Sequence, residues 1–119
     1  MTQLHMVKTI TTLLNDNKGQ DICVLDVQNL TAITDYMIVV TGSSDRHVKA
    51  LARFVIDGMK QDEKTAPLAI EGDREGDWII VDYSFVMVHV MLDEQREFYE
   101  LERLWTDPDN NNEIDHQLS

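Results

Sequence analysis

The sequence is short of cysteine and of long apolar runs, and each shortage excludes a class of protein. Its 119 residues include one cysteine, Cys23, so no disulfide can form within the chain. The N-terminus also lacks the basic region and apolar run of a secretory signal, and we therefore expect a reduced, cytoplasmic protein. Every apolar run is interrupted before the roughly 18 residues that a membrane helix needs, which predicts no membrane span.

Basic residues are also scarce, with 10 Lys and Arg against 22 Asp and Glu, for a formal charge of −12. Four of the acids follow Trp105, which leaves 18 acids against 10 bases, or −8, on residues 1–105. Because nucleic-acid binding depends on Lys and Arg neutralising phosphates, direct sequence-specific binding of nucleic acid is disfavoured. The acidity either attracts a basic protein surface or only keeps the protein soluble, and composition leaves both open.

Residue patterns that carry metal or nucleophilic chemistry are missing as well. The four histidines, at positions 5, 47, 89 and 116, do not show the paired spacing of a zinc site. His47 is interpreted as a helix-start residue with a local hydrogen bond, and His89 as a half-buried strand residue. We therefore expect no metal, no cofactor and no catalytic residues.

The segment Gly42-Ser43-Ser44, between a predicted strand and a predicted helix, admits two interpretations. It is either an anion-binding helix start or an ordinary capped one. The lysine of a phosphate-binding P-loop is missing. Nucleotidyltransferases place Gly-Ser before a helix too, but they follow it with an Asp-x-Asp or Asp-x-Glu on the next strand, and no predicted strand has one.

Hydrophobic periodicity predicts three helices and five strands in a single domain over residues 1–105. The expected helices span 4–16, 45 to about 60, and a segment from Asp93 with Phe98, Leu101 and Trp105 on its buried stripe; the expected strands span 22–27, 36–41, 68–71, 78–82 and 85–91. The last three strands form an antiparallel meander. If strands 36–41 and 68–71 are neighbours, they are parallel and the sheet is mixed.

The predicted fold is thus α/β (α+β), a mixed five-stranded sheet flanked by helices in the order α-β-β-α-β-β-β-α. Residues 106–119 are polar and acidic, offer only Ile114 and Leu118 to a core, and are expected to be disordered.

Polar and aromatic residues flank the predicted central hairpin and suggest a recognition surface rather than a reaction centre. They are Glu71, Asp77, Trp78, Asp82 and Tyr83. Trp and Tyr are typical interface anchors, because they bury a large area and keep a polar atom for hydrogen bonding. Strand alternation places Trp78 and Asp82 on one face and Tyr83 on the other. For Trp78, a place in the core and a place at a contact both remain open.

Several spaced blocks, in order from about residue 4 to 105, resemble the Iojap/RsfS family of ribosomal silencing factors. The blocks are Asp35-Tyr36, Thr41-Gly42-Ser43-Ser44, Arg46-His47-Val48, Glu71-Gly72, Trp78 to Tyr83, Val88-His89-Val90, and Arg96 to Trp105. One departure is that Ser84-Phe85 stands where the family often has Gly-Asp.

The resemblance implies a non-enzymatic repressor of translation that binds a basic protein of the large ribosomal subunit, the one numbered fourteen. Binding there would block joining of the small subunit sterically. The implied fold is similar to that of nucleotidyltransferases without their catalytic acids, and the family tends to dimerise.

The expected contact residues are Glu71, Trp78, Asp82 and Tyr83, or else the final helix around Arg96, Tyr99 and Glu100. The alternative function is a nucleotidyltransferase-like, nucleotide-binding enzyme.

Overall fold

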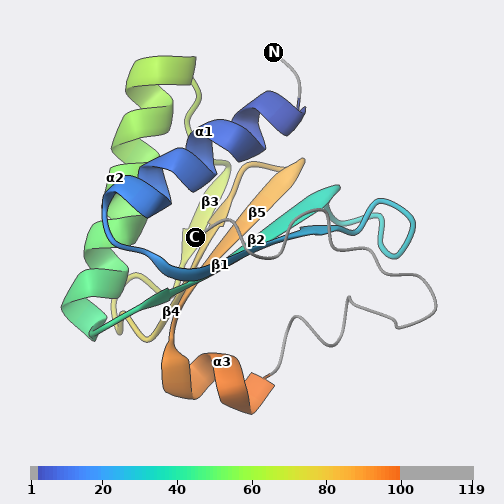
Figure 1. Cartoon of the computed structure of the whole chain (residues 1–119). Coiled ribbons are helices and arrows are strands. Elements are labelled where there is room, and N and C mark those ends of the chain that lie inside the picture. The colour runs from blue at the N-terminus through green and yellow to red at the C-terminus, as the bar shows by residue number, and fades with distance from the viewer. Residues whose placement is uncertain (1–2, 100–119) are drawn as a thin grey trace.

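The computed structural model describes the backbone of residues 3–99 and the side chains of residues 3–96. Its elements follow the predicted order: α1 (Gln3–Asp16), β1 (Gln20–Asp26), β2 (Tyr36–Gly42), α2 (Asp45–Glu63), β3 (Ala69–Glu71), β4 (Trp78–Asp82), β5 (Val86–Leu92) and α3 (Asp93–Tyr99). The strands form one mixed sheet, with α1 and α2 side by side over one of its faces (Figure 1). The predicted α+β class is confirmed. Leu101, Trp105 and the predicted tail, 106–119, lie outside the described residues.

The strand order in the sheet is β1-β2-β5-β4-β3, so β2 and β3 are not neighbours and the condition stated for a parallel pair is not met, although the sheet is mixed. The parallel neighbour of β2 is β5, whereas β3 lies at the far edge beyond β4. The physical reason is the composition of the two strands. β5 is largely buried on both faces and therefore suits the centre, whereas all three residues of β3 are exposed. The antiparallel meander β3-β4-β5 is confirmed.

The main core lies between the sheet and the helices α1 and α2. Both helices present an apolar face to it, and β5 contributes three valines from alternate positions; the fully buried members include Ile10, Leu14, Ile38, Leu51, Val55, Val88 and Val90. We call this side the helix-covered face. No helix among the described residues is both long enough and apolar enough to cross a membrane.

The opposite side, which we call the second face, carries a smaller apolar cluster of Cys23, Leu25, Val27, Met37, Val39 and Met91, with Trp78 packed against it. α3 lies at one end of the sheet, after β5 (Figure 1). The Arg96 Nη1 of α3 donates a hydrogen bond to Thr41 Oγ1 of β2 at 2.9 Å. This bond ties the helix to the end of β2.

Candidate functional site

Three of the predicted contact residues, Glu71, Trp78 and Asp82, share the second face. In the strand register Glu71 lies opposite Ile80, so it shares the face of Ile80 and its alternate neighbours Trp78 and Asp82. Glu71 is exposed, and the other two are half-buried. The structure therefore brings an aromatic ring and two carboxylates to one side of the sheet.

Trp78 is both packed and accessible, which answers the choice left open between core and contact. Its ring packs against the apolar cluster of the second face, yet the residue is only half-buried. Its indole Nε1–H donates to His89 Nδ1 at 3.0 Å, and the two rings have centroids 5.9 Å apart with planes tilted by 41°. An anchor that is held in place and remains partly exposed is typical of interface centres.

Tyr83 requires a correction, because the structure places it in the core and not at a contact surface. Strand alternation groups it with Ile79 and Val81 on the helix-covered face, where it is 4% exposed. Its hydroxyl has no hydrogen-bond partner among the described residues, and burial raises the pKa of Tyr83 to about 12. The ring therefore supports the fold, and the contact surface has to be sought elsewhere.

Asp82 has a structural role beside its charge. Its Oδ1 accepts a hydrogen bond from the backbone N–H of Ser84 at 2.7 Å, in the turn between β4 and β5. Ser84 has a φ of 73°, in the left-handed region that favours glycine. The glycine that the resemblance leads us to expect here would suit this conformation, and in this chain the Asp82 carboxylate supports the same conformation with serine in place. The departure at Ser84-Phe85 therefore keeps a tight turn, with Phe85 exposed.

The final helix supplies one described member of the alternative contact group. Arg96 is half-buried and bonded to Thr41, and Gln95 Nε2 donates to Asp77 Oδ2 at 3.3 Å. The side chain of Tyr99, and Glu100 altogether, lie outside the described residues. Arg96 therefore lies near the end of the second face, where β2 finishes.

The start of α2 resembles a capped helix more than an anion site, because backbone N–H groups at this helix start already donate to side chains of the same loop. His47 N–H donates to Ser44 Oγ at 3.1 Å, and Arg46 N–H donates to Asp45 Oδ1 at 2.8 Å. Ser43 N–H donates to His47 Nδ1 at 2.8 Å, and His47 Nε2 lies 3.1 Å from the Asn17 carbonyl oxygen. His47 therefore links this loop to the end of α1, as a local hydrogen-bonding residue would.

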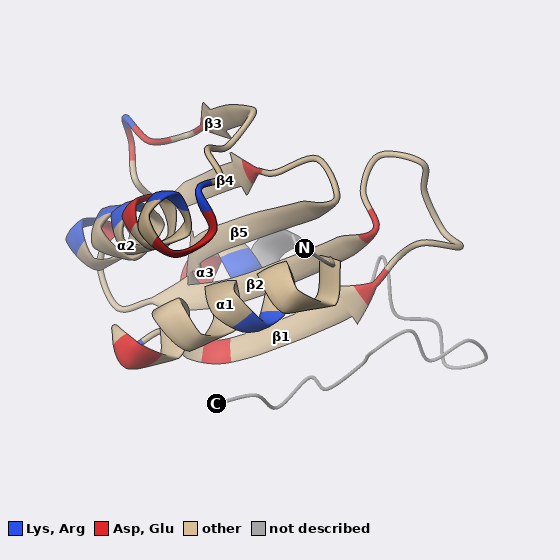
Figure 2. Ribbon diagram, turned by 90° about the horizontal axis from the view of Figure 1, so that it is seen from above, with Lys and Arg blue, Asp and Glu red and all other residues tan. Residues whose placement is uncertain are grey.

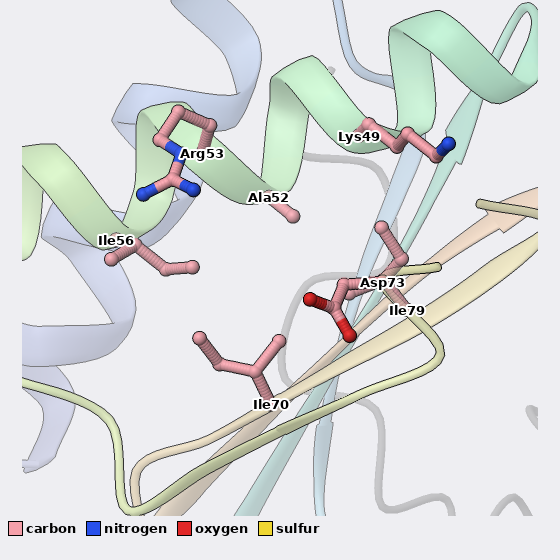
Figure 3. A pocket seen from close by; sticks show the side chains of 7 residues that line it. All are labelled: Lys49, Ala52, Arg53, Ile56, Ile70, Asp73 and Ile79. Atoms are coloured by element: carbon pink, nitrogen blue, oxygen red, sulfur yellow. The ribbon is translucent and has the colours of Figure 1, made fainter. Parts of the chain in front are cut away.

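A cavity of about 220 Å³ lies between α2 and the β3–β4 hairpin (Figure 3). Ala52, Ile56, Ile70 and Ile79 form its apolar part, and Lys49, Arg53 and Asp73 lie around it. A nucleotidyltransferase centre needs paired carboxylates for two metal ions, and Asp73 is the one acid lining this cavity. Among the described residues, no group of three or more His, Cys, Asp or Glu is arranged to hold a metal ion.

Charge is distributed unevenly between the two sides of the sheet. α2, on the helix-covered face, carries Arg46, Lys49, Arg53 and Lys60, interleaved with acids (Figure 2). The strands of the second face instead contribute the carboxylates of Glu71 and Asp82 beside Trp78. Beside Trp78 a basic partner therefore meets complementary charge, while Arg96, a basic residue, lies near the end of β2 on the same face.

Comparison with known proteins agrees with this architecture. A crystal structure of a protein from Chromobacterium violaceum superimposes with a TM-score of 0.85 at 41% identity and covers 88% of this chain and 87% of that one. A second, from Bacillus halodurans, has a TM-score of 0.77 at 23% identity and covers 87% of this chain and 95% of that one, which shows the shared fold.

Sequence relatives are more specific. Ribosomal silencing factor RsfS of Chromobacterium violaceum is 45% identical over 92 residues, or 77% of this chain and 75% of the relative. That of Bacillus subtilis is 34% identical over 108 residues, or 90% of each. The family model described as "Ribosomal silencing factor during starvation" matches residues 1–119. The resemblance seen in the sequence is confirmed, and the chain belongs to the RsfS family of ribosomal silencing factors.

Proposed function

We propose that this chain represses translation by binding the large ribosomal subunit through a basic ribosomal protein, the one numbered fourteen, and blocking the small subunit from joining. The observation that carries the proposal is the grouping of Glu71, Trp78 and Asp82 on the second face. The activity is non-enzymatic, and the site of action is cytoplasmic. Family membership supports a ribosomal target.

The physical mechanism is occupancy of a surface. Trp78 provides apolar area at the centre of the contact, and Glu71 and Asp82 attract basic side chains around it. The acidic field of the protein raises the rate of encounter with a basic surface. Once bound, the protein needs no chemistry, because its volume excludes the other subunit.

The test mixes purified subunits with excess protein and follows the formation of joined ribosomes by light scattering. Wild-type protein should inhibit joining, and Trp78→Ala should weaken binding to the large subunit by more than about tenfold, or about 1.4 kcal/mol. Because Trp78 also packs in the second face, the melting temperature of the variant is measured alongside. Absence of inhibition by wild-type protein at any concentration would defeat the proposal.

The charged residues are tested by the salt dependence of association. Glu71→Lys should slow capture most at low ionic strength, and less as salt screens the field. The second carboxylate is tested in the same assay with Asp82→Asn, which removes the charge and keeps an acceptor oxygen for the Ser84 N–H. The matched control is Asp62→Lys, since Asp62 is an exposed acid on α2. Equal slowing by Glu71→Lys and Asp62→Lys would show a general field effect and move the proposed contact to the alternative group, α3 around Arg96.

The enzymatic alternative is tested with nucleotide and Mg²⁺. Thermal stabilisation specific to a nucleotide would favour a nucleotide-binding enzyme, because a ligand that binds only the native state raises its stability. The silencing proposal expects no such shift.

We also propose self-association through a sheet edge. β1 and β3 are the edge strands, and β1, seven residues long, is the more extended of the two. An open edge can pair with its counterpart in a second copy. Sedimentation at micromolar concentration should show a dimer, and a monomer alone would remove the idea.

A further inference from the structure

His89 stands at the middle of the second face, on the central strand β5. Its direct neighbours across the sheet are Ile80 on β4 and Val39 on β2, both apolar. The histidine is 5% exposed, so it is a buried polar residue in an apolar row. Trp78 is its diagonal neighbour on β4, within reach of a hydrogen bond between ring nitrogens.

The hydrogen bond from Trp78 fixes the chemical state of the imidazole. Nδ1 accepts from the indole, so in the neutral ring the proton is on Nε2. Nε2 is buried and has no hydrogen-bond partner among the described residues. A buried donor without a partner is destabilising, so His89 carries an energetic cost that leucine at the same position would avoid.

We propose that His89 is a positioning residue of the ribosome-contact surface: it holds the Trp78 indole in its binding orientation. This inference rests on the proposed function in treating Trp78 as the anchor. A side chain already fixed in its bound orientation loses less conformational entropy when the partner arrives. Among the described residues, the hydrogen bond from Trp78 is the one hydrogen bond of the His89 ring that offsets the cost of burying it.

The same bond specifies how Trp78 meets its partner. The indole N–H, its one polar group, is already donated to His89 and is turned into the sheet. The partner therefore meets the ring itself and not its N–H. With Glu71 and Asp82 on the same face, the partner group that fits is a Lys or Arg side chain lying against the indole.

Three substitutions of His89 separate positioning from packing. His89→Asn keeps an acceptor, because its Oδ1 is two covalent bonds from Cβ, as Nδ1 is in histidine. His89→Gln is polar but moves the acceptor one bond farther out, and His89→Leu removes it. Each is made in a Trp105→Phe background, so that Trp78 is the single tryptophan and its indole ¹H–¹⁵N resonance is unambiguous.

The proposal expects the indole proton of Trp78 to be shifted downfield and protected from exchange in the Trp105→Phe parent and in its His89→Asn variant, and to lose both properties in the His89→Leu variant. Binding to large subunits should fall at least tenfold for Leu and Gln and less than threefold for Asn. The Leu variant should melt within a few degrees of the wild type, because it removes the unpartnered Nε2–H and the half-buried Trp78 can turn its freed indole N–H toward water. A residue that only packs would not separate stability from binding in this way.

Wild-type binding and an unchanged indole signal in folded His89→Leu would overturn the proposal. If the Leu variant does not fold, the proposal is tested by comparing the binding of the Asn and Gln variants. Equal binding by these two variants overturns the proposal. If the wild type itself fails to bind large subunits, the proposed function fails, while the indole measurement still shows whether His89 orients Trp78.

Discussion

At the scale of single residues, the buried hydroxyl of Tyr83 gives a direct prediction about stability. It has no partner among the described residues, so Tyr83→Phe removes an unsatisfied polar group without changing the shape of the ring. We expect the free energy of unfolding to rise by about 1 kcal/mol, measured by urea denaturation. A fall of similar size would reveal a hydrogen bond that the described residues do not supply. Tyr83→Ala should instead cost about 3 kcal/mol or more.

His89 gives the protein a specific dependence on pH. Burial lowers the pKa of His89 to about 4 from 6.5, so the unfolded chain takes up this proton at a higher pH than the folded protein. Above pH 6.5 the ring is neutral in both states and does not make stability depend on pH; as the pH falls toward 4, the unfolded chain binds the proton first, and the free energy of unfolding falls by about 3 kcal/mol at most.

Denaturation of the wild type and His89→Asn at several pH values checks this. Carboxylates titrate in both proteins, so the difference between them isolates the histidine. Parallel curves between pH 6.5 and 4 would contradict the prediction.

At the scale of elements, the hairpin between β3 and β4 depends on two glycines with positive φ. Gly72 has φ 80°, and a Cβ there would collide with the Trp78 carbonyl oxygen. Gly76 has φ 78°, but its nearest obstacle is the flexible Lys49 side chain, at 2.6 Å. We expect Gly72→Ala to cost about 2 kcal/mol or more, and Gly76→Ala about 1 kcal/mol, by thermal denaturation. Equal losses of stability in the two variants would show that the positive φ, and not the collision of the new Cβ, sets the cost of each substitution.

Elements and faces were the predictable part of the fold, because they depend on local patterns. Alternation along residues 78–83 correctly placed Trp78 and Asp82 opposite Tyr83. The same pattern should have removed Tyr83 from the predicted contact group, since a residue on the face of Ile79 and Val81 packs in the core.

Which strands pair could not be predicted from local patterns. The position of β5 beside β2 depends on long-range packing, and the sequence offers for it only the apolar character of both faces of β5. The contact between Trp78 and His89 has a different origin, because it follows from the register of β4 against β5 inside the predicted meander. The meander predicts neighbouring strands without their exact register, and the expectation of a half-buried strand residue at position 89 is wrong, because His89 is 5% exposed and accepts a hydrogen bond from Trp78.

At the scale of the whole molecule, residues 107–119 carry four acids and few apolar side chains. Deleting them should leave the melting temperature and ribosome binding nearly unchanged, because they offer little to bury. Thermal denaturation and binding to large subunits check this. A large fall in melting temperature would contradict the prediction.

The position of β5 also has a consequence for synthesis. The strand at the centre of the sheet is the last to be made, and both of its neighbours, β2 and β4, must wait for it. A nascent chain that ends before residue 86 therefore has two separate pieces of sheet with unpaired edges, and contacts far apart in sequence slow folding. A protein built in this way completes its second face only after nearly all of its described residues have been translated.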